Sequence, residues 1–502
     1  MNTRKRLAAM QTAGVIPGTT TLANPACVAT PGQPCEHSLV DPQLNCSLSA
    51  YEQRVRARFV AIVDTLKALS AEQHELDFVE RAQRVARERL GYELPDSLLG
   101  EAWVSGLNLR ALHSYCIFRS FKECIDQVET DQQSWRQHMT LDAEFIRACG
   151  YHTLDVSPCA DGRLQGLLPF VLRMAPDASI FVKAYAGAMF DVEADVVDWT
   201  QRELARLTGG IPECQDGKYL KVAVYHYSTS NPCDQGCAAH GSNDHKATEL
   251  ALVRLNELRA AIDNTYGRGA APDILLVGMD TDVDAIRIHL PDGNGEISPY
   301  RFVESASLYR ETLGMNALAA RDQIEAAVTK AENADGWALG SGPMEAGIRR
   351  LVLRLLEANL SQIEYVIQHH AGRYAVIGHN ERFICAGEAM SELQLRNKFY
   401  FAHLDTVEEG AADMDVGIRI FTGLNIKHGL AIPVLVHFHY TSRVPGARER
   451  ALLRCKRVKA AIEARYAHLH KQGLLNCQMA ISDHEGSERC QFIEDDVRDS
   501  GH

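Results

Sequence analysis

The sequence predicts a protein of the α+β or α/β class, with a helical N-terminal domain followed by two related sheet-forming units. Three observations support this prediction. Apolar residues recur at helical spacing between about residues 48 and 135. After residue 136, short strand-like runs alternate with helical segments, as expected for crossover units around a parallel or mixed sheet. Segments of 136–344 also return in weakened form within 345–502.

Composition limits the class of protein. At 502 residues the chain exceeds what one hydrophobic core usually supports. A hydrophobic fraction of 46% with 23% charged residues indicates a globular protein, and a net charge of −13 argues against nucleic acid as the main partner. No apolar run approaches the ~20 residues that span a bilayer. The 14 cysteines show no regular framework, which favours a reducing compartment without secretion.

Residues 1–47 are rich in Gly, Pro and Thr and show no sustained period, so we expect a disordered N-terminal tail. Two interpretations stay open. The segment is either a solvated tail or a tether whose basic residues Arg4, Lys5 and Arg6 help it to fold onto a partner.

Residues 48–135 form the predicted helical domain. Helices are expected at 51–69, 71–90, 101–120 and 121–135, with another helix starting near Asp96, which follows Pro95. Cys116 and Cys124 have no partners at ligand spacing and are interpreted as core residues. No catalytic cluster is predicted in this domain.

Residues 136–344 form the predicted metal-binding α/β domain. Strands are expected at 153–156, 221–228, 274–279 and 285–289, and helices at 141–149, 197–207 and 248–266. Cys159 comes just after the first strand and His226 lies within the second. Both positions suit a site at the edge of the sheet where the strands end.

The remaining residues, 345–502, are predicted to be a degenerate repeat of this domain. The segment His226–Pro232 returns as 439–445, and 259–266 returns as 459–466. The segment 159–163 is matched to 378–382, and 434–440 is expected to form a central strand.

On this alignment Gly378 replaces Cys159 and Asn380 replaces Asp161, while Arg450 follows His439 by the interval that separates Cys237 from His226. The second copy has therefore lost both thiolates, so we expect it to bind no zinc.

The main chemical signal is Cys159-Ala-Asp161-Gly-Arg163, with His226 and Cys237 further along the chain. Thiolates and imidazoles are zinc ligands, and two Cys with one His leave a fourth position open, as catalytic zinc sites do. Asp161 and Arg163 are two residues apart and could pair beside the metal.

The same stretch of chain offers other zinc arrangements. Cys233, Cys237, His240 and His245 share one loop, and the spacing Cys237–His240 alone would suit zinc. Cys214 is interpreted as a bystander. A closed structural site would leave Asp161 and Arg163 without a purpose. A zinc deaminase needs His-x-Glu followed by Pro-Cys-x-x-Cys, and residues 231–237 hold one residue too many between their cysteines.

These motifs resemble those of the carboxysome shell carbonic anhydrases, the epsilon-class relatives of the beta-carbonic anhydrases. The resemblance rests on residues 159–163, on the eleven-residue interval from His226 to Cys237, and on 280–289. Ordinary beta enzymes place the second Cys three residues after the His. The resemblance implies one zinc ion held by Cys159, His226 and Cys237. Asp161 would accept a hydrogen bond from the attacking group, and Arg163 would hold Asp161 away from the metal.

The resemblance also implies that the chain interconverts CO2 and bicarbonate inside the carboxysome of a bacterial cytoplasm and supplies CO2 to Rubisco. The tail would contact Rubisco or shell proteins, and the chain would form a homodimer or a higher homo-oligomer. Tyr225, Tyr227 and nearby histidines are candidate proton carriers. The alternative is a non-catalytic scaffold protein of the carboxysome that zinc stabilises.

Overall fold

The computed structural model describes residues 37–493, with gaps at 101, 140–141, 175–178, 210–216, 334–341, 375–379, 389, 391–395, 397, 405–409 and 484–489. Within this part, the chain divides into two compact units. The first-sheet unit comprises 37–49 and 134–378, and the second-sheet unit comprises 50–133 and 379–493. No helix of the described residues is both long and apolar enough to cross a membrane.

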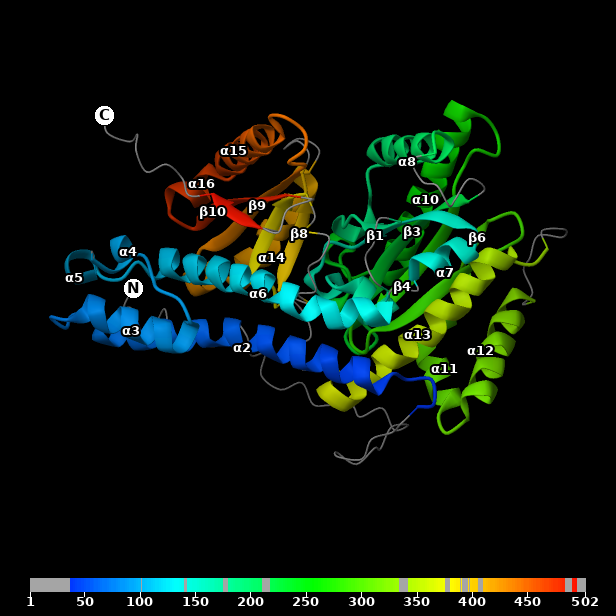
Figure 1. Cartoon of the computed structure of the whole chain (residues 1–502), viewed down its shortest axis with the longest axis horizontal. Coiled ribbons are helices and arrows are strands. Elements are labelled where there is room, and N and C mark those ends of the chain that lie inside the picture. Colours follow the sequence, from blue (N-terminus) through cyan, green and yellow to red (C-terminus); the bar gives the residue numbers. More distant parts are fainter. Residues whose placement is uncertain are drawn as a thin grey trace. The chain divides into compact units, whose positions relative to one another are not determined.

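The first-sheet unit contains a six-stranded sheet of order β2-β1-β3-β4-β5-β6 (Figure 1). Strands β2, β1, β3 and β4 run parallel, and β5 runs antiparallel to both of its neighbours, β4 and β6. The central parallel strands are buried along almost their whole length, as expected when helices cover both faces. The strands are β1 (Tyr151–Pro158), β2 (Ile180–Val182), β3 (Lys218–Tyr227), β4 (Asp273–Asp280), β5 (Ala285–Pro291) and β6 (Ile297–Glu304).

Helices of this unit pack on the sheet and on one another. Helix α10 lies along β3 and β4, and α13 packs against β5. The helices are α7 (Asp142–Ala148), α8 (Val192–Leu207), α9 (Pro232–Gln235), α10 (Asp244–Tyr266), α11 (Ser305–Thr312), α12 (Ala317–Glu332) and α13 (Ala346–His370). Short turns are η1 (Gly162–Leu164), η2 (Leu167–Leu172), η3 (Ala186–Ala188) and η4 (Ala238–His240).

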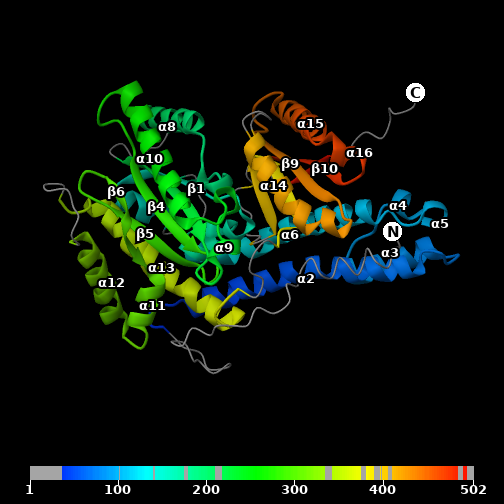
Figure 2. The same ribbon diagram turned by 180° about the vertical axis from the view of Figure 1, so that it is seen from behind.

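The second-sheet unit contains a five-stranded sheet of order β11-β10-β9-β7-β8, in which only β11 is antiparallel to its neighbour (Figure 2). The strands are β7 (Phe383–Gly387), β8 (Phe399–His403), β9 (Ile432–Tyr440), β10 (Leu475–Asp483) and β11 (Gln491–Ile493). The helices that belong to this unit wholly or in large part are α2 (Pro42–Glu72), α3 (Phe78–Leu90), α4 (Asp96–Gly100), α5 (Ala102–Ser105), α6 (Leu109–Met139), α14 (Ala411–Leu424), α15 (Ala447–Arg465) and α16 (Ala467–Lys471), with the turn η5 (Ile426–His428).

The four predicted strands of 136–344 and the three predicted helices are confirmed, as is the central position of β9. The helical region differs in detail. A turn at Gln73, whose side chain accepts a hydrogen bond from the Leu107 N–H at 3.0 Å, separates α2 from α3. The helices expected at 101–120 and 121–135 are instead one helix from Leu109, since no Gly or Pro interrupts it.

The predicted tail is also shorter than expected, because α2 begins at Pro42. Residues on both sides of this helix start are anchored. His37 Nε2 lies 2.7 Å from Thr312 Oγ1, and Asn45 Nδ2 donates to the Ser361 carbonyl at 3.1 Å. Residues 1–36 of the predicted tail lie outside the described residues.

The units divide the chain differently from the predicted boundaries at 135/136 and 344/345. Helix α13 belongs to the first-sheet unit, where Asn359 Nδ2 donates to the carbonyls of Val171 and Asp284 at 2.9 Å. Residues 50–133 group with the second sheet. There Asn476 Nδ2 donates to Ser114 Oγ at 2.9 Å, and the Phe121 and Phe383 rings lie 4.7 Å apart.

The two sheets share an order of elements. Strands β8-β7-β9-β10-β11 of the second sheet occupy the places of β2-β1-β3-β4-β5 in the first, with the same directions. In the first sheet α8 follows β2 and α10 follows β3. In the second sheet α14 follows β8 and α15 follows β9. Positions 251, 255, 258 and 262 are buried on α10, and positions 451, 455, 458 and 462 are buried on α15.

The predicted alignment of 159–163 with 378–382 is wrong. Residues 159–163 follow β1, whereas 380–382 precede β7, and Gly378 lies outside the described residues. The Cys159 N–H donates to the Val224 carbonyl at 3.0 Å, and the Glu388 N–H donates to the His437 carbonyl at 2.9 Å. Val224 lies two residues before His226, and His437 lies two residues before His439. Glu388 therefore occupies the position of Cys159.

Arg450 does not occupy the position of Cys237 either. Residues 228–243 connect β3 to α10, but only 441–446 connect β9 to α15. The second connection is too short to contain a counterpart of Cys237, and Arg450 lies within α15.

Candidate metal centre

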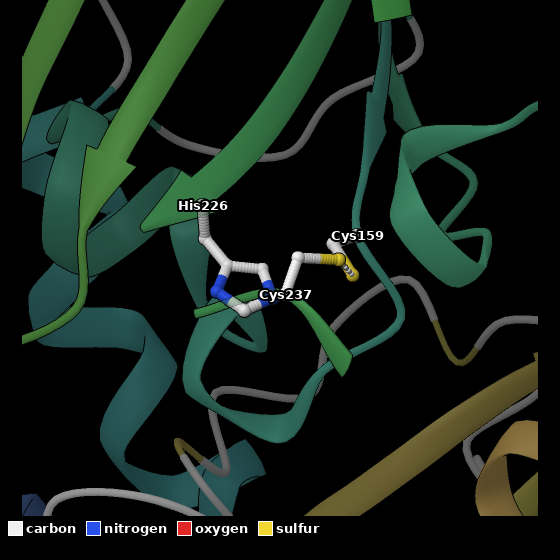
Figure 3. Close-up of side chains that lie close together, drawn as sticks. All are labelled: Cys159, His226 and Cys237. Carbon is white, nitrogen blue, oxygen red and sulfur yellow. Dashed lines mark hydrogen bonds between the residues drawn. The ribbon is translucent and has the colours of Figure 1, made fainter. Parts of the chain in front are cut away.

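Three predicted ligands converge at the carboxyl edge of the first sheet. Figure 3 shows the side chains of Cys159, His226 and Cys237 directed toward one another. One ligand atom from each lies within 4.8 Å of the other two, and all three residues are buried. The Sγ atoms of Cys159 and Cys237 are 3.8 Å apart.

The local fold explains this convergence. In the parallel pair of β1 and β3, Pro158 lies opposite Val224, so Cys159 leaves β1 beside the end of β3 that carries His226. The connection 228–243 then returns Cys237 to the same edge. Neither ring nitrogen of His226 has a hydrogen-bond partner among the described residues, which is unusual for a fully buried imidazole.

The protons of the two thiols are coupled. The pKa of Cys159 is raised well above its usual value, because its thiol hydrogen-bonds to Cys237 and because it is buried. The pKa of Cys237 is lowered by the same hydrogen bond. A bound dication would favour the thiolate form of both.

Asp161 and Arg163 form the predicted pair. Arg163 donates through Nε to Asp161 Oδ1 at 2.8 Å, through Nη2 to Oδ2 at 2.8 Å, and through its backbone N–H to Oδ1 at 2.9 Å. Arg163 Nη1 also donates to the Gln235 carbonyl at 2.7 Å. Asp161 Oδ2 lies 3.6 Å from His226 Nε2, so the pair borders the ligand cluster.

His240 lies close to the cluster but is not part of it. Its Nε2 lies 3.0 Å from the Gly187 carbonyl oxygen, while the Gly187 N–H donates to Cys159 Sγ at 3.3 Å. Gly187 has a φ of +69°, and a Cβ at this position would collide with His240 Nε2. Gly187 therefore contacts Cys159 directly, and His240 holds Gly187 in place. The sequence Ala-Gly-Ala around Gly187 carries no signal from which this could be predicted.

The segment that follows β4 fixes the start of the connection to Cys237. Asp282 accepts hydrogen bonds from the Ser230 N–H at 2.7 Å and from Ser228 Oγ at 3.0 Å. Asp280 accepts one from Thr229 Oγ1 at 2.6 Å, and burial raises the pKa of Asp280 to about 6. The sequence alone assigns Asp280 and Asp282 no role, and these contacts give them one.

Other predicted candidates do not reach the cluster. Side chains alternate along a strand, so Tyr225 and Tyr227 lie on the face of β3 opposite His226. Tyr225 hydroxyl lies 2.8 Å from His289 Nε2, and the Arg287 guanidinium lies over the Tyr227 ring. Cys233 is exposed, and Cys214 lies outside the described residues.

The fold and the site define an α/β protein with a buried Cys2His candidate metal centre beside a carboxylate–guanidinium pair. Family models of the carboxysome shell carbonic anhydrase match along the chain: the N-terminal model at residues 37–129, the catalytic-domain model at 141–379 and the C-terminal model at 380–497.

Curated proteins give the same result. The carboxysome shell carbonic anhydrase of Halothiobacillus neapolitanus is 44% identical over 462 residues, covering 91% of this chain and 90% of the relative. That of Parasynechococcus marenigrum is 45% identical over 464 residues, covering 91% and 79%. That of Prochlorococcus marinus is 42% identical over 466 residues, covering 92% and 89%. The chain belongs to the carboxysome shell carbonic anhydrase family.

Proposed function

We propose that the chain interconverts CO2 and bicarbonate at a zinc ion held by Cys159, His226 and Cys237. The convergence of these buried side chains carries the proposal. Two thiolates bound at about 2.3 Å to a tetrahedral zinc lie about 3.8 Å apart, and the two Sγ atoms here are 3.8 Å apart. The ring nitrogens of His226, which make no hydrogen bond to any residue that the structure describes, also suit a metal ligand.

A zinc ion with three protein ligands supplies a water-derived nucleophile at neutral pH, by lowering the pKa of a bound water from 15.7 to roughly 7. The protein contributes orientation. Asp161 accepts a hydrogen bond from the attacking group and so directs its lone pair at the carbon of CO2. Arg163 keeps Asp161 ionised and turned away from the ligand position, because both carboxylate oxygens already accept hydrogen bonds from it.

Stopped-flow measurement of CO2 hydration, together with the zinc content of the purified protein, tests this function. We expect one zinc per chain and rapid hydration, both of which are lost in Cys159→Ala. A protein with full zinc content and no hydration above the uncatalysed rate would instead support the zinc-stabilised scaffold of the carboxysome.

The names of the relatives suggest the setting. We propose that the chain acts in the carboxysome, where it supplies CO2 to Rubisco, and that it assembles as a homodimer or higher homo-oligomer. The tail residues before His37 would contact Rubisco or shell proteins. Analytical ultracentrifugation of the purified chain, alone and with Rubisco, tests the assembly and the contact separately.

We also propose that the second sheet arose by duplication of the first and then lost its metal site. The shared order of strands and helices and the matching buried positions of α10 and α15 support this origin. Glu388 stands in place of Cys159, and the connection that carries Cys237 is reduced to residues 441–446. Glu388→Cys with Arg450→Cys should therefore bind no second zinc, because Arg450 lies within α15 and not at the place of Cys237. A second equivalent of tightly bound zinc in this double variant would contradict the proposal that the second sheet lost its metal site when this connection became shorter.

A further inference from the structure

Two basic side chains stand side by side at the start of the second sheet. Arg382 and Lys398 directly precede β7 and β8, whose first residues, Phe383 and Phe399, are register partners. The Arg382 N–H donates to the Lys398 carbonyl at 2.7 Å. The two residues are thus neighbours across the strand pair, on the face opposite the two phenylalanines. Like charges in such positions repel each other.

Lys398 is buried and forms no ion pair with a described residue. Its exposed fraction is 8%, and no hydrogen bond or ion pair joins its amine to any residue that the structure describes. Lys221 is the contrasting case, because it is fully buried but paired with Asp155 at 2.9 Å and with Asp195. Burial, and after it the charge of Arg382, lowers the pKa of Lys398 to about 7. Burial also acts to lower the pKa of Lys221, but the two carboxylates outweigh it and raise that pKa above its usual value.

The groups around Lys398 come from several elements. The charge of Arg56 of α2 lowers the pKa of Lys398, whereas Glu52 of α2 and Glu381 raise it. His113 of α6 has its pKa lowered to about 4 by burial and by the charge of Arg382, so it adds no positive charge at neutral pH. The same unit contains the buried Arg396. It also contains Cys124, and the charge of Lys398 acts to lower the pKa of the Cys124 thiol. Glu52 already lies 3.8 Å from Arg56.

We propose that Lys398 Nζ is a second reaction site for CO2, where it forms a reversible carbamate that Arg382 holds. The lone pair of the uncharged amine attacks the carbon of CO2 and forms the N–C bond. One C=O π pair becomes the negative charge of the carboxylate, and the nitrogen gives one proton to solvent. No oxidant, reductant or metal is required.

The carbamate turns a repulsive pair into an attractive one. Arg382 donates through Nη2 to Asn380 Oδ1 at 2.9 Å, while its buried Nε has no hydrogen-bond partner among the described residues. A carbamate on the neighbouring lysine would give this guanidinium an anionic acceptor. This site goes beyond the proposed function and does not depend on it, because CO2 in solution is sufficient for the reaction.

Trapping with triethyloxonium tests the proposal, since it converts a carbamate into a stable ethyl ester that peptide mass spectrometry can locate. The full chain is equilibrated with 13C-labelled CO2 at pH 7.5 and trapped. We expect the labelled ester on Lys398 and none on Lys221. The α-amino group, whose usual pKa is about 7.7–8.0, is the internal positive control. Label on the α-amino group with none on Lys398 would overturn the proposal, and this comparison needs no variant.

Variants then test the roles of Lys398 and Arg382 separately. Arg382→Gln should lower the label on Lys398 by about tenfold, because the carbamate loses its cationic partner. Lys398→Arg should remove it and leave zinc-dependent hydration unchanged. Cys159→Ala should keep the label, so failure of the proposed function and failure of this inference give different results. Equal labelling of Lys398 in the Arg382→Gln protein would refute the assigned role of Arg382.

Discussion

Asp161 and Arg163 act as one group, because three hydrogen bonds join them and both are buried. We predict that Arg163→Ala keeps zinc but lowers the turnover of CO2 hydration by about 10²–10⁴, the range of positioned proton-transfer groups. Asp161→Asn should do the same, since it removes the carboxylate that orients the attacking group. Stopped-flow hydration and zinc analysis of both variants are the measurements.

Arg321→Ala is the matched control, because Arg321 makes a similar two-nitrogen contact with Glu357 on the surface. Exposed pairs contribute little, so this variant should hydrate CO2 at the normal rate. Normal turnover in Arg163→Ala would show that the pair has no catalytic role.

The ligand assignment is tested by a second comparison of single residues. Cys237→Ala should lose zinc, because Cys237 Sγ lies in the ligand cluster. His240→Ala should keep it, because His240 hydrogen-bonds to the Gly187 carbonyl instead. Zinc retained in the first variant and lost in the second would reverse the assignment of Cys237 and His240.

Residue types and intervals were enough to predict which side chains would meet. Cys159 and His226 end or follow neighbouring strands, and strand ends meet at one sheet edge. Gly187 could not be predicted in the same way, because its contact with Cys159 depends on a left-handed turn that no side chain signals. Tyr225 is a candidate proton carrier by its place next to His226 in the sequence, but the alternation of side chains along β3 puts it on the other face.

At the scale of elements, the connection between β3 and α10 is held by Asp282 rather than by packing alone. We predict that Asp282→Ala weakens zinc binding by about 10–100-fold, as changes to residues that support metal ligands typically do. The loss of hydrogen bonds to residues 228–230 would let the Cys237 segment move. A competition titration with a chelator measures the affinity.

The hairpin between β5 and β6 offers the control. Asp292 accepts backbone hydrogen bonds from Asn294 and Glu296 at 2.9 Å, an arrangement similar to that at Asp282. Asp292→Ala removes comparable contacts from a loop that carries no ligand, so zinc affinity should not change. Equal loss of affinity in both variants would show general destabilisation.

The N-terminal element gives a prediction with two deletions. Removing residues 1–36 should leave hydration unchanged but weaken association with Rubisco, more so at low salt if Arg4, Lys5 and Arg6 provide attraction that is screened over about 10 Å at 0.1 M. Removing 1–47 should also lower the melting temperature, because it takes away the contacts of His37 and Asn45. Arg173, which donates to Asn45, would remain buried with one partner fewer.

Co-sedimentation with Rubisco at two salt concentrations, and thermal melting of both proteins, measure these effects. Equal binding of Rubisco by the full chain and by the protein lacking 1–36 would contradict the tether. Equal melting temperatures of the two deletion proteins would contradict the anchoring of 37–47.

Elements that bury apolar side chains are predicted well. The fully buried strands around Cys159 and His226 follow from their runs of apolar residues, and the helix along β3 follows from apolar residues at helical spacing. Helix boundaries in 71–135 were less accurate, because the end of α2 depends on the side chain of Gln73 meeting the Leu107 N–H, a contact between distant parts of the chain.

At the scale of the whole molecule, the chain passes between its units more than once. Residues 37–49 and 134–378 form one unit, and the intervening helices join 379–493 in the other. The sequence predicts three consecutive domains, and this division stays a prediction. Composition and periodicity do not show that the helices of 50–133 group with the second sheet, because they do not show which surface a helix covers. The repeat of element order is detectable in sequence, but the match of Glu388 to Cys159 requires strand register.

This division predicts what happens when the chain ends after Gly378. All proposed zinc ligands remain, but α6 loses the second sheet, so buried side chains that pack on it, such as Phe121 against Phe383, become exposed to water. We predict an insoluble or inactive fragment, because burial of such side chains contributes about 1.5–3 kcal/mol each. Co-expression of residues 379–502 as a separate chain should restore soluble protein and CO2 hydration, while ending the chain after Ile493 should change neither. Solubility, zinc content and stopped-flow rates of the three proteins are compared. A soluble 1–378 fragment with near-normal hydration would show that the first-sheet unit folds without the second sheet and that the helices of 50–133 do not depend on it.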